Sequence, residues 1–317
     1  MNTVYFIAQQ TMFFAIPLMI VAIGGMFSER SGIVNIALEG IMVMGAFVSI
    51  SFINVFQDII SGQLLLILSI FVAGLSGLIF SLLHAFASIN MKADQTISGT
   101  ALNMFAPAFA IFVARMVQGV QQIQFVDTFH IYKVPILGDI PILGPILFQN
   151  CYITTYIGFA IVIASEIVIN HTKFGLRLRA CGEFPQAADS VGINVYRIRY
   201  AGVMISGALA GIGGLVFVVP TSTNFNATVT GYGFLALAVL IFGQWRTRRI
   251  FFAAFFFGIM KTFASAYSGI PILKTLPISN EVYKMIPYIA TLVVLAFFSK
   301  SSQAPRAEGI PYDKGSR

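Results

Sequence analysis

The chain has 317 residues, 57% of them hydrophobic and only 10% charged, and it carries a formal net charge of +7. Soluble globular proteins carry roughly 25% charged residues, so this composition excludes a soluble globular domain. The basic residues are spread between long apolar stretches instead of gathering on a polar domain, which argues against a nucleic-acid-binding protein.

Nine apolar stretches predict membrane-spanning helices, because a helix needs about 20 apolar residues to cross a bilayer. The first has no Lys or Arg before Arg30, so it lacks the basic start of a signal peptide and is expected to be a retained span. The expected total is eight to ten, because the seventh stretch is short and glycine-rich segments can hide a broken helix. We therefore predict an all-α polytopic membrane protein, a single domain over 1–317, with spans near 4–25, 36–56, 64–88, 97–117, 152–170, 200–220, 232–245, 250–268 and 284–299.

The distribution of Lys and Arg predicts the orientation of the chain. If residues 171–199 lie in the cytoplasm, fourteen of the nineteen basic residues fall on the inner side, which includes Lys300, Arg317 and the tail 300–317. An odd number of spans then places the amino terminus outside and the carboxyl terminus in the cytoplasm. Lys274 is among the few basic residues expected outside.

Two polar segments separate the spans. The outer one, 118–150, contains PILGDIPILGP, whose Pro and Gly residues favour an irregular loop or a short surface helix over another span. We expect it to be an extracellular loop against which an external binding protein docks. The inner one, 171–199, is the longest polar and charged stretch of the chain and is the main candidate for function.

The inner segment is predicted to contain a short helix over 186–191, with Pro185 at its first turn and Gly192 as its C-cap. A short helix between two spans can act as a lever on a cytoplasmic ATPase, and two small alanines would permit close approach. An inner loop of any multispan protein can also be basic and partly helical, and these residues alone do not decide between the two interpretations.

A resemblance decides between them. The run HTKFGLRLRACGEFPQAADSVGIN is similar to RTRFGLRLRAxGENPxAADxxGIN, a hallmark of permeases of the simple-sugar and nucleoside branch of bacterial ATP-binding cassette (ABC) importers. FSERSGIVNIALEGIMVMGAF, ADQTISGTALN and GYGFLALAVLIFGQW resemble further motifs of this branch, so the matches extend over nearly the whole chain. The chain looks most like the shorter of two paralogous permeases of purine nucleoside importers. It departs from the motif at Phe184, where the family usually has Asn.

This resemblance implies the type II ABC importer permease fold, in the bacterial cytoplasmic membrane. It also implies a heterodimer with a longer homologous permease, a tandem ABC ATPase that binds ATP and Mg²⁺, and an extracytoplasmic lipoprotein that binds the solute. The permease itself would bind no cofactor or metal and would not be an enzyme. The resemblance assigns the contact with the ATPase to Gly182, Glu183, Pro185, Ala187, Ala188, Asp189 and Gly192.

Four polar residues within or next to the spans are candidates for the translocation pathway. Asn35 and Glu39 are four positions apart and so share one helical face, and a carboxylate in apolar surroundings must be paired, protonated or face water. The alternative for Glu39 is a structural pairing near Arg30. Ser98 and Asn103 form a second polar run, in which the Asn103 amide could contact a base edge or ribose hydroxyl or make an interhelical hydrogen bond.

Other classes of protein fit less well. The chain has no G-x-x-x-x-G-K-[ST] motif, so an ATPase must be a separate subunit, and no catalytic pair of an intramembrane protease is present. A ribose or galactose permease remains the nearest alternative. An ion-coupled secondary transporter is the alternative from another class, but it has no need for the polar inner segment.

Overall fold

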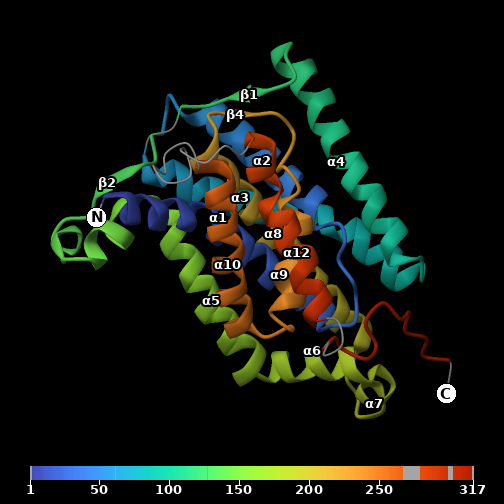
Figure 1. Ribbon diagram of the computed structural model, residues 1–317. Coiled ribbons are helices and arrows are strands. Elements are labelled where there is room, and N and C mark those ends of the chain that lie inside the picture. Colours follow the sequence, from blue (N-terminus) through green and yellow to red (C-terminus); the bar gives the residue numbers. More distant parts are fainter. Residues whose placement is uncertain (1, 61, 127, 267–278, 299–302, 316–317) are drawn as a thin grey trace.

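The computed structural model describes residues 2–315 except 61, 127, 267–278 and 299–302. Helices make up most of it (Figure 1). They are α1 (Asn2–Glu29), α2 (Leu38–Phe56), α3 (Gln63–Ala85) with a π-helical extension (Phe86–Asn90), α4 (Gln95–Gln118), α5 (Ile153–His171), α6 (Lys173–Glu183), α7 (Pro185–Ser190), α8 (Val195–Thr221), α9 (Tyr232–Phe242), α10 (Thr247–Ala266) and α12 (Asn280–Phe298).

Each of the nine predicted spans contains a helix. In the described residues, six helices are long and apolar enough to cross a membrane, namely α1, α2, α3 with its extension, α4, α5 and α8. The seventh predicted stretch holds α9, which has only 11 residues, and the last two hold α10 and α12. The prediction of an all-α polytopic membrane protein is confirmed.

Helix α8 lies at the centre of the molecule and packs against α1, α2 and α3. Small residues allow these helices to approach closely. A Cβ atom added at Gly211 would overlap the Ala73 carbonyl of α3, and one added at Gly214 would overlap the Met42 carbonyl of α2. These glycines bring the backbones of α2, α3 and α8 into direct contact.

The two polar segments lie at opposite ends of the helix bundle, as the alternation of spans predicts (Figure 1). One end carries two antiparallel strand pairs, β1 (Ile123–Gln124) with β4 (Asn224–Phe225) and β2 (Ile131–Lys133) with β3 (Gln149–Cys151). These strands were not predicted, because runs of two or three residues carry no recognisable alternation. Helices α6 and α7 form the other end.

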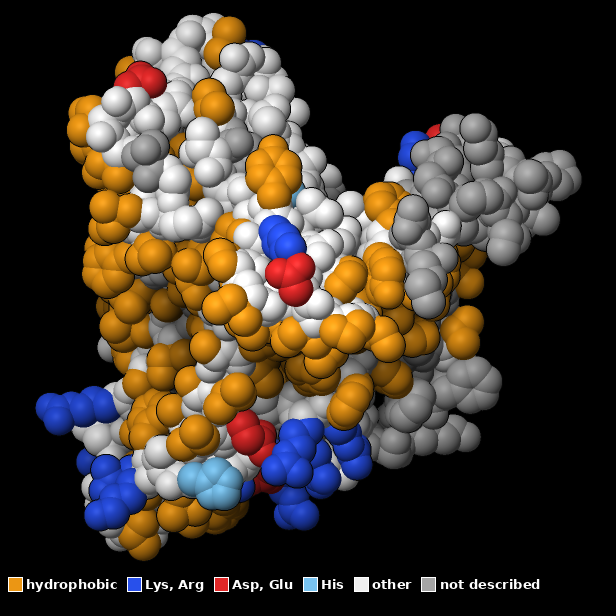
Figure 2. All heavy atoms as spheres, turned by 90° about the vertical axis from the view of Figure 1, so that its left-hand side faces the viewer, with side chains coloured by type: hydrophobic (Ala, Val, Ile, Leu, Met, Phe, Trp, Pro, Cys, Tyr) orange, Lys and Arg blue, Asp and Glu red, His pale blue; other side chains and the backbone are white. Residues whose placement is uncertain are grey.

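The surface of the molecule has the pattern of a membrane protein. Hydrophobic side chains form a broad band across the face shown in Figure 2, and most of the Lys and Arg side chains in that view gather below the band, at the end that carries α6 and α7. Of the basic residues used to predict orientation, Lys274, Lys300 and Arg317 lie outside the described residues.

Candidate functional site

The inner segment folds as two consecutive helices, α6 and α7, which together with the C-cap residue of α7 we call the elbow (residues 173–191). Helix α6 begins after Thr172, whose hydroxyl accepts a hydrogen bond from the Gly175 amide at 3.1 Å. It ends at Glu183, and Phe184 turns the chain into α7. Helix α6 was not predicted as a separate element. Its Lys and Arg residues make the segment look like a charged loop and obscure the helical period of its apolar residues.

The short helix α7 matches the sequence prediction to within one residue. Pro185 occupies its first turn, where its missing N–H costs no hydrogen bond. At the other end the Gly192 amide donates to the Asp189 carbonyl at 2.9 Å, and the Ile193 amide donates to the Ala188 carbonyl at 3.1 Å. This is a Schellman motif, which needs a left-handed residue, and Gly192 supplies it with φ +84°.

The tip of the elbow is apolar and exposed. Phe184 is 62% exposed and Val191 is 74% exposed, and Ala187 is also on the surface. Ala188 is instead buried against Cys181, Val195 and Tyr312. Of the two alanines expected to permit close approach of a partner, only Ala187 is therefore available at the surface.

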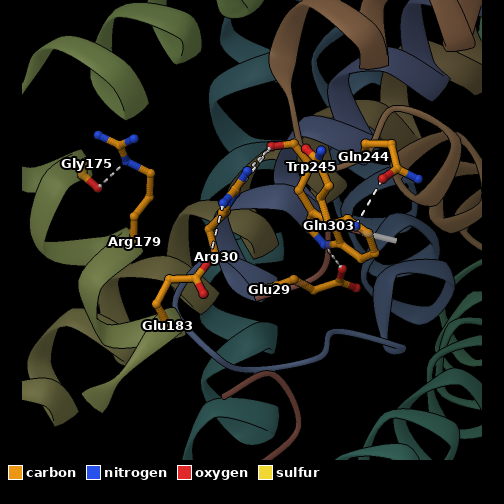
Figure 3. A network of polar contacts seen from close by, with 8 residues as sticks. All are labelled: Glu29, Arg30, Gly175, Arg179, Glu183, Gln244, Trp245 and Gln303. Carbon is orange, nitrogen blue, oxygen red and sulfur yellow. Dashed lines mark hydrogen bonds and ion pairs between the residues drawn. The ribbon is translucent and has the colours of Figure 1, made fainter. Parts of the chain in front are cut away.

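The elbow is anchored to the ends of α1 and α9 (Figure 3). The Glu183 carboxylate lies 3.9 Å from the Arg30 guanidinium, and Arg30 donates to the Trp245 carbonyl at 2.9 Å. The Trp245 indole N–H in turn donates to the Glu29 carboxylate. Gly182 packs directly on the Arg30 carbonyl, where any Cβ would overlap. A displacement of the elbow therefore acts on the segment that connects α1 to α2.

The described part of the carboxyl-terminal tail, 303–315, binds the same region. The Ala307 amide donates to the Gly182 carbonyl at 2.8 Å, and the Gly309 amide donates to the Gly32 carbonyl at 3.1 Å. The buried Arg199 guanidinium donates to the Ile310 carbonyl at 3.1 Å. The tail thus fastens the elbow to α1 and α8.

Three of the four predicted pathway residues are tied to the connector between α1 and α2, residues 30–37, whereas Glu39 lies in α2. Asn35 lies in the connector, before α2 begins, so the prediction that it shares a helical face with Glu39 is wrong. The Asn103 amide group bridges the connector, accepting from the Gly40 amide at 2.7 Å and donating to the Ile36 carbonyl at 2.8 Å. Asn35 is fully buried and donates to the Ser206 hydroxyl at 2.8 Å. Ser98 binds His84 at 2.9 Å, and the other nitrogen of that ring binds the Val34 carbonyl at 2.9 Å.

Glu39 binds the amino terminus of α9. Its two carboxylate oxygens accept from the amides of Gly231, at 2.8 Å, and Gly233, at 2.6 Å. The sequence suggested that Glu39 makes a structural pairing near Arg30. This partner is wrong, because Arg30 pairs with Glu183 and Glu39 binds the amides of α9. The first N–H groups of a helix have no partner within the helix and the positive end of its dipole favours an anion, so this remote carboxylate caps α9.

A comparison with protein families shows to which family the chain belongs. Residues 7–295 match the sequence model of the permease component of the branched-chain amino acid transport system. The chain belongs to this permease family. Permeases of this family act with an ATPase and a solute-binding protein, so the elbow belongs to one subunit of a larger membrane assembly.

Curated relatives show which permeases within the family this chain is similar to. It is 44% identical over 313 residues to the guanosine ABC transporter permease protein NupQ of Bacillus subtilis, covering 98% of this chain and 97% of that protein. It is 40% identical over 314 residues, or 99% of this chain and 98% of that protein, to the nucleoside ABC transporter permease protein NupC of Lactococcus lactis. It is 27% identical over 89% of this chain and 88% of that protein to the putative glucose ABC transporter permease protein TsgC13 of Haloferax volcanii. No solved structure matches the permease.

Sequence reasoning missed several residues of this network in the permease. Gln95 accepts from the Val34 amide at 2.7 Å, and the side chain of Trp245 joins the ends of α1 and α9. The available signal was composition, because Trp245 is the single tryptophan in the chain, whereas Glu29 and Gln95 stand among other polar residues and are not distinguished locally. Their partners lie far away in the sequence and no local pattern could supply them.

Replacement of Asn103 by leucine is expected to loosen the connector. Leucine can neither accept from Gly40 nor donate to Ile36, and each unsatisfied buried group costs about 1–3 kcal/mol. We expect Asn103→Leu to lower the free energy of unfolding by about 2–4 kcal/mol, measured by unfolding of the purified permease in detergent. A variant as stable as wild type but altered in solute specificity would instead make Asn103 a solute contact.

The attachment of the tail is expected to depend on pH. Burial raises the pKa of the Glu308 carboxyl to about 7, against the opposing effects of a hydrogen bond with Glu29 and the charge of Arg30. The docked tail therefore favours protonated Glu308. The stabilisation that protonated Glu308 gives to the docked tail is complete below the ordinary pKa of 4.5 and is lost as the pH rises through about 7.

The fluorescence of Trp245, which binds Glu29, reports this change. We expect its emission to titrate near pH 7 in the purified permease and to lose this transition in Glu308→Gln. Asp313→Asn is the control, because the Gly315 amide and the Lys92 ion pair hold the Asp313 pKa below its ordinary value. A transition that persists in Glu308→Gln would contradict the assignment.

Proposed function

We propose that the chain is the permease subunit of an ABC importer for nucleosides, and specifically for purine nucleosides. The identities support this substrate class, at 44% and 40% to permeases described as guanosine and nucleoside transporters against 27% to one described as a putative glucose transporter. The type II importer fold and alternating access belong to the same proposal. A ribose or galactose permease is the alternative.

The elbow is proposed to face the cytoplasm and to receive the ATPase. The observation that carries this role is its exposed apolar tip, Phe184, Ala187 and Val191, at the basic end of the molecule (Figure 2). Several exposed apolar side chains close together on an otherwise polar segment indicate a surface that a partner covers. The segment 171–199 is then a cytoplasmic coupling loop, 118–150 an extracellular loop and 300–317 a cytoplasmic tail.

The contacts provide a physical route for coupling. Motion of the elbow acts through Glu183 and Gly182 on Arg30 and so on the α1–α2 connector. The connector leads into Glu39, which holds the start of α9, while Trp245 at the end of α9 is held by Glu29 and Arg30. In this proposal ATP and Mg²⁺ act on the partner ATPase, and α9 is the element that the elbow moves.

The second permease of the assembly is proposed to be a longer homologue. Lactococcus lactis has both NupC and the nucleoside ABC transporter permease protein NupB, to which this chain is 23% identical. The alignment covers 93% of this chain but only 80% of NupB, so NupB is the longer protein. Two nucleoside permeases of unequal length in one organism support a heterodimer.

Uptake of radiolabelled guanosine by cells with and without this chain tests the proposal. Chain-dependent uptake that vanadate abolishes in vesicles, and that excess unlabelled ribose leaves unchanged, is the expected result. Uptake that ribose blocks would assign the chain to the sugar permeases. Uptake driven by a proton gradient alone would make it a secondary transporter.

A further inference from the structure

A basic pocket of about 710 Å³ opens beside the elbow. Its walls carry six arginines but only two acidic residues, Glu166 and Glu183. Both glutamates are already paired, with Arg248 at 3.2 Å and with Arg30 at 3.9 Å. The arginines are Arg30, Arg179, Arg246, Arg248, Arg249 and Arg306.

Three of these arginines are exposed and make no ion pair with an acidic residue in the described part of the chain, namely Arg246, Arg249 and Arg306. The pocket wall also includes the first turn of α10, Thr247 to Arg249. The first amides of a helix lack partners within the helix, and its dipole adds positive potential there. Among the described residues, the pocket therefore has more positive charge than the neighbouring acidic residues neutralise.

An apolar groove of about 380 Å³ continues from this pocket toward the hydrophobic band. It runs between α5 and α10 and shares Glu166, Thr247 and Arg248 with the basic pocket. Ile163 and Phe252 line it and are 62% and 71% exposed. In Figure 2 the hydrophobic band meets the basic side chains at this end of the molecule.

We propose that the pocket and the groove together form a binding site for an anionic phospholipid. The phosphate lies among the arginines and one acyl chain lies in the groove between α5 and α10. Basic pockets at the end of membrane helices suit anionic head groups, and the neighbouring apolar groove distinguishes a lipid from a free phosphate ion. The bound lipid contacts both α6, through Arg179, and α10, so it braces the elbow against the helix bundle.

Lipid binding to the assembled transporter, purified in mild detergent, tests this site. The probes are phosphatidylglycerol, phosphatidylcholine with the same acyl chains, glycerophosphoglycerol and inorganic phosphate, with binding followed by native mass spectrometry. Each basic residue near a charged lipid surface contributes about fivefold in affinity. We therefore expect the triple variant Arg246→Gln, Arg249→Gln, Arg306→Gln to bind phosphatidylglycerol about 100-fold more weakly.

The matched control removes three exposed basic residues that lie outside both the pocket and the elbow, by Lys92→Gln, Arg197→Gln and Lys314→Gln. It is expected to change the affinity less than about twofold, since exposed charges away from the pocket act weakly on it through water. Ile163→Trp, which fills the groove, is expected to weaken phosphatidylglycerol and leave glycerophosphoglycerol unchanged.

Three results would overturn the proposal. Equal losses in the two triple variants would mean nonspecific attraction to a basic surface. Equal affinity for phosphate and phosphatidylglycerol would make the pocket a site for a free anion. Unchanged phosphatidylglycerol binding in both the pocket triple variant and Ile163→Trp would mean that another subunit covers this face. Guanosine uptake is not among these readouts, so failure of the lipid site is distinguishable from failure of the proposed transport function.

Discussion

Phe184→Asp is expected to abolish association of the ATPase with this permease while the permease itself stays folded. Phe184 is 62% exposed at the tip of the elbow, so the free subunit loses little when it is replaced. In the assembly, burial of a phenylalanine side chain contributes about 1.5–3 kcal/mol, and an aspartate there would also bury an unpaired charge. The expected loss of affinity is at least about 100-fold, since each 1.4 kcal/mol is a factor of ten.

Co-purification of the ATPase with tagged permease measures this effect, and the thermal midpoint of the permease alone checks its folding. Tyr132→Asp is the matched control, because Tyr132 is 79% exposed and belongs to β2, which lies at the other end of the molecule from α7 (Figure 1). The control is expected to retain the ATPase. If Phe184→Asp also retained it, the tip of α7 would not be the docking surface, and the role proposed for the elbow would be wrong.

The membrane-spanning helices could be predicted from the sequence, because the bilayer around them requires a helical backbone. A stretch of apolar residues in a bilayer must satisfy its backbone groups internally, so hydropathy alone locates the spans. Helix α7 could also be predicted, because Pro185 and Gly192 mark its two ends by local backbone preferences. Both predictions depend on residues that are neighbours in the sequence.

The polar contacts of the interior could be predicted only in part. Polarity within apolar surroundings singled out Asn35, Glu39, Ser98 and Asn103, and each of them makes a side-chain hydrogen bond to another part of the chain. Their place in the translocation pathway stays a prediction. Their partners could not be found, because Glu39 binds amides 192 and 194 positions away and Asn35 binds a hydroxyl 171 positions away. The sequence places Glu39 nine positions after Arg30 and suggested a pairing between them, but the fold brings the start of α9 to Glu39 and the elbow to Arg30.

Glu39→Gln is expected to destabilise α9 and to reduce transport more than tenfold. The carboxylate accepts two amide hydrogen bonds, whereas a glutamine side chain has one oxygen and would turn its NH₂ group toward the second amide. Hydrogen bonds to a charged group contribute about 1.5–3 kcal/mol each. The loss of one bond and of the charge at the helix terminus should lower the free energy of unfolding by about 2–4 kcal/mol.

Unfolding in detergent and uptake into vesicles separate the two interpretations of Glu39. Glu281→Gln is the control, because Glu281 is 76% exposed, makes a surface ion pair with Lys284 and should change stability by less than about 0.5 kcal/mol. If Glu39→Gln abolished uptake at wild-type stability, Glu39 would contact the solute rather than hold α9. If stability and uptake were both unchanged, the link from the connector to α9 would carry no coupling, because the carboxylate is its only charged contact in the described residues.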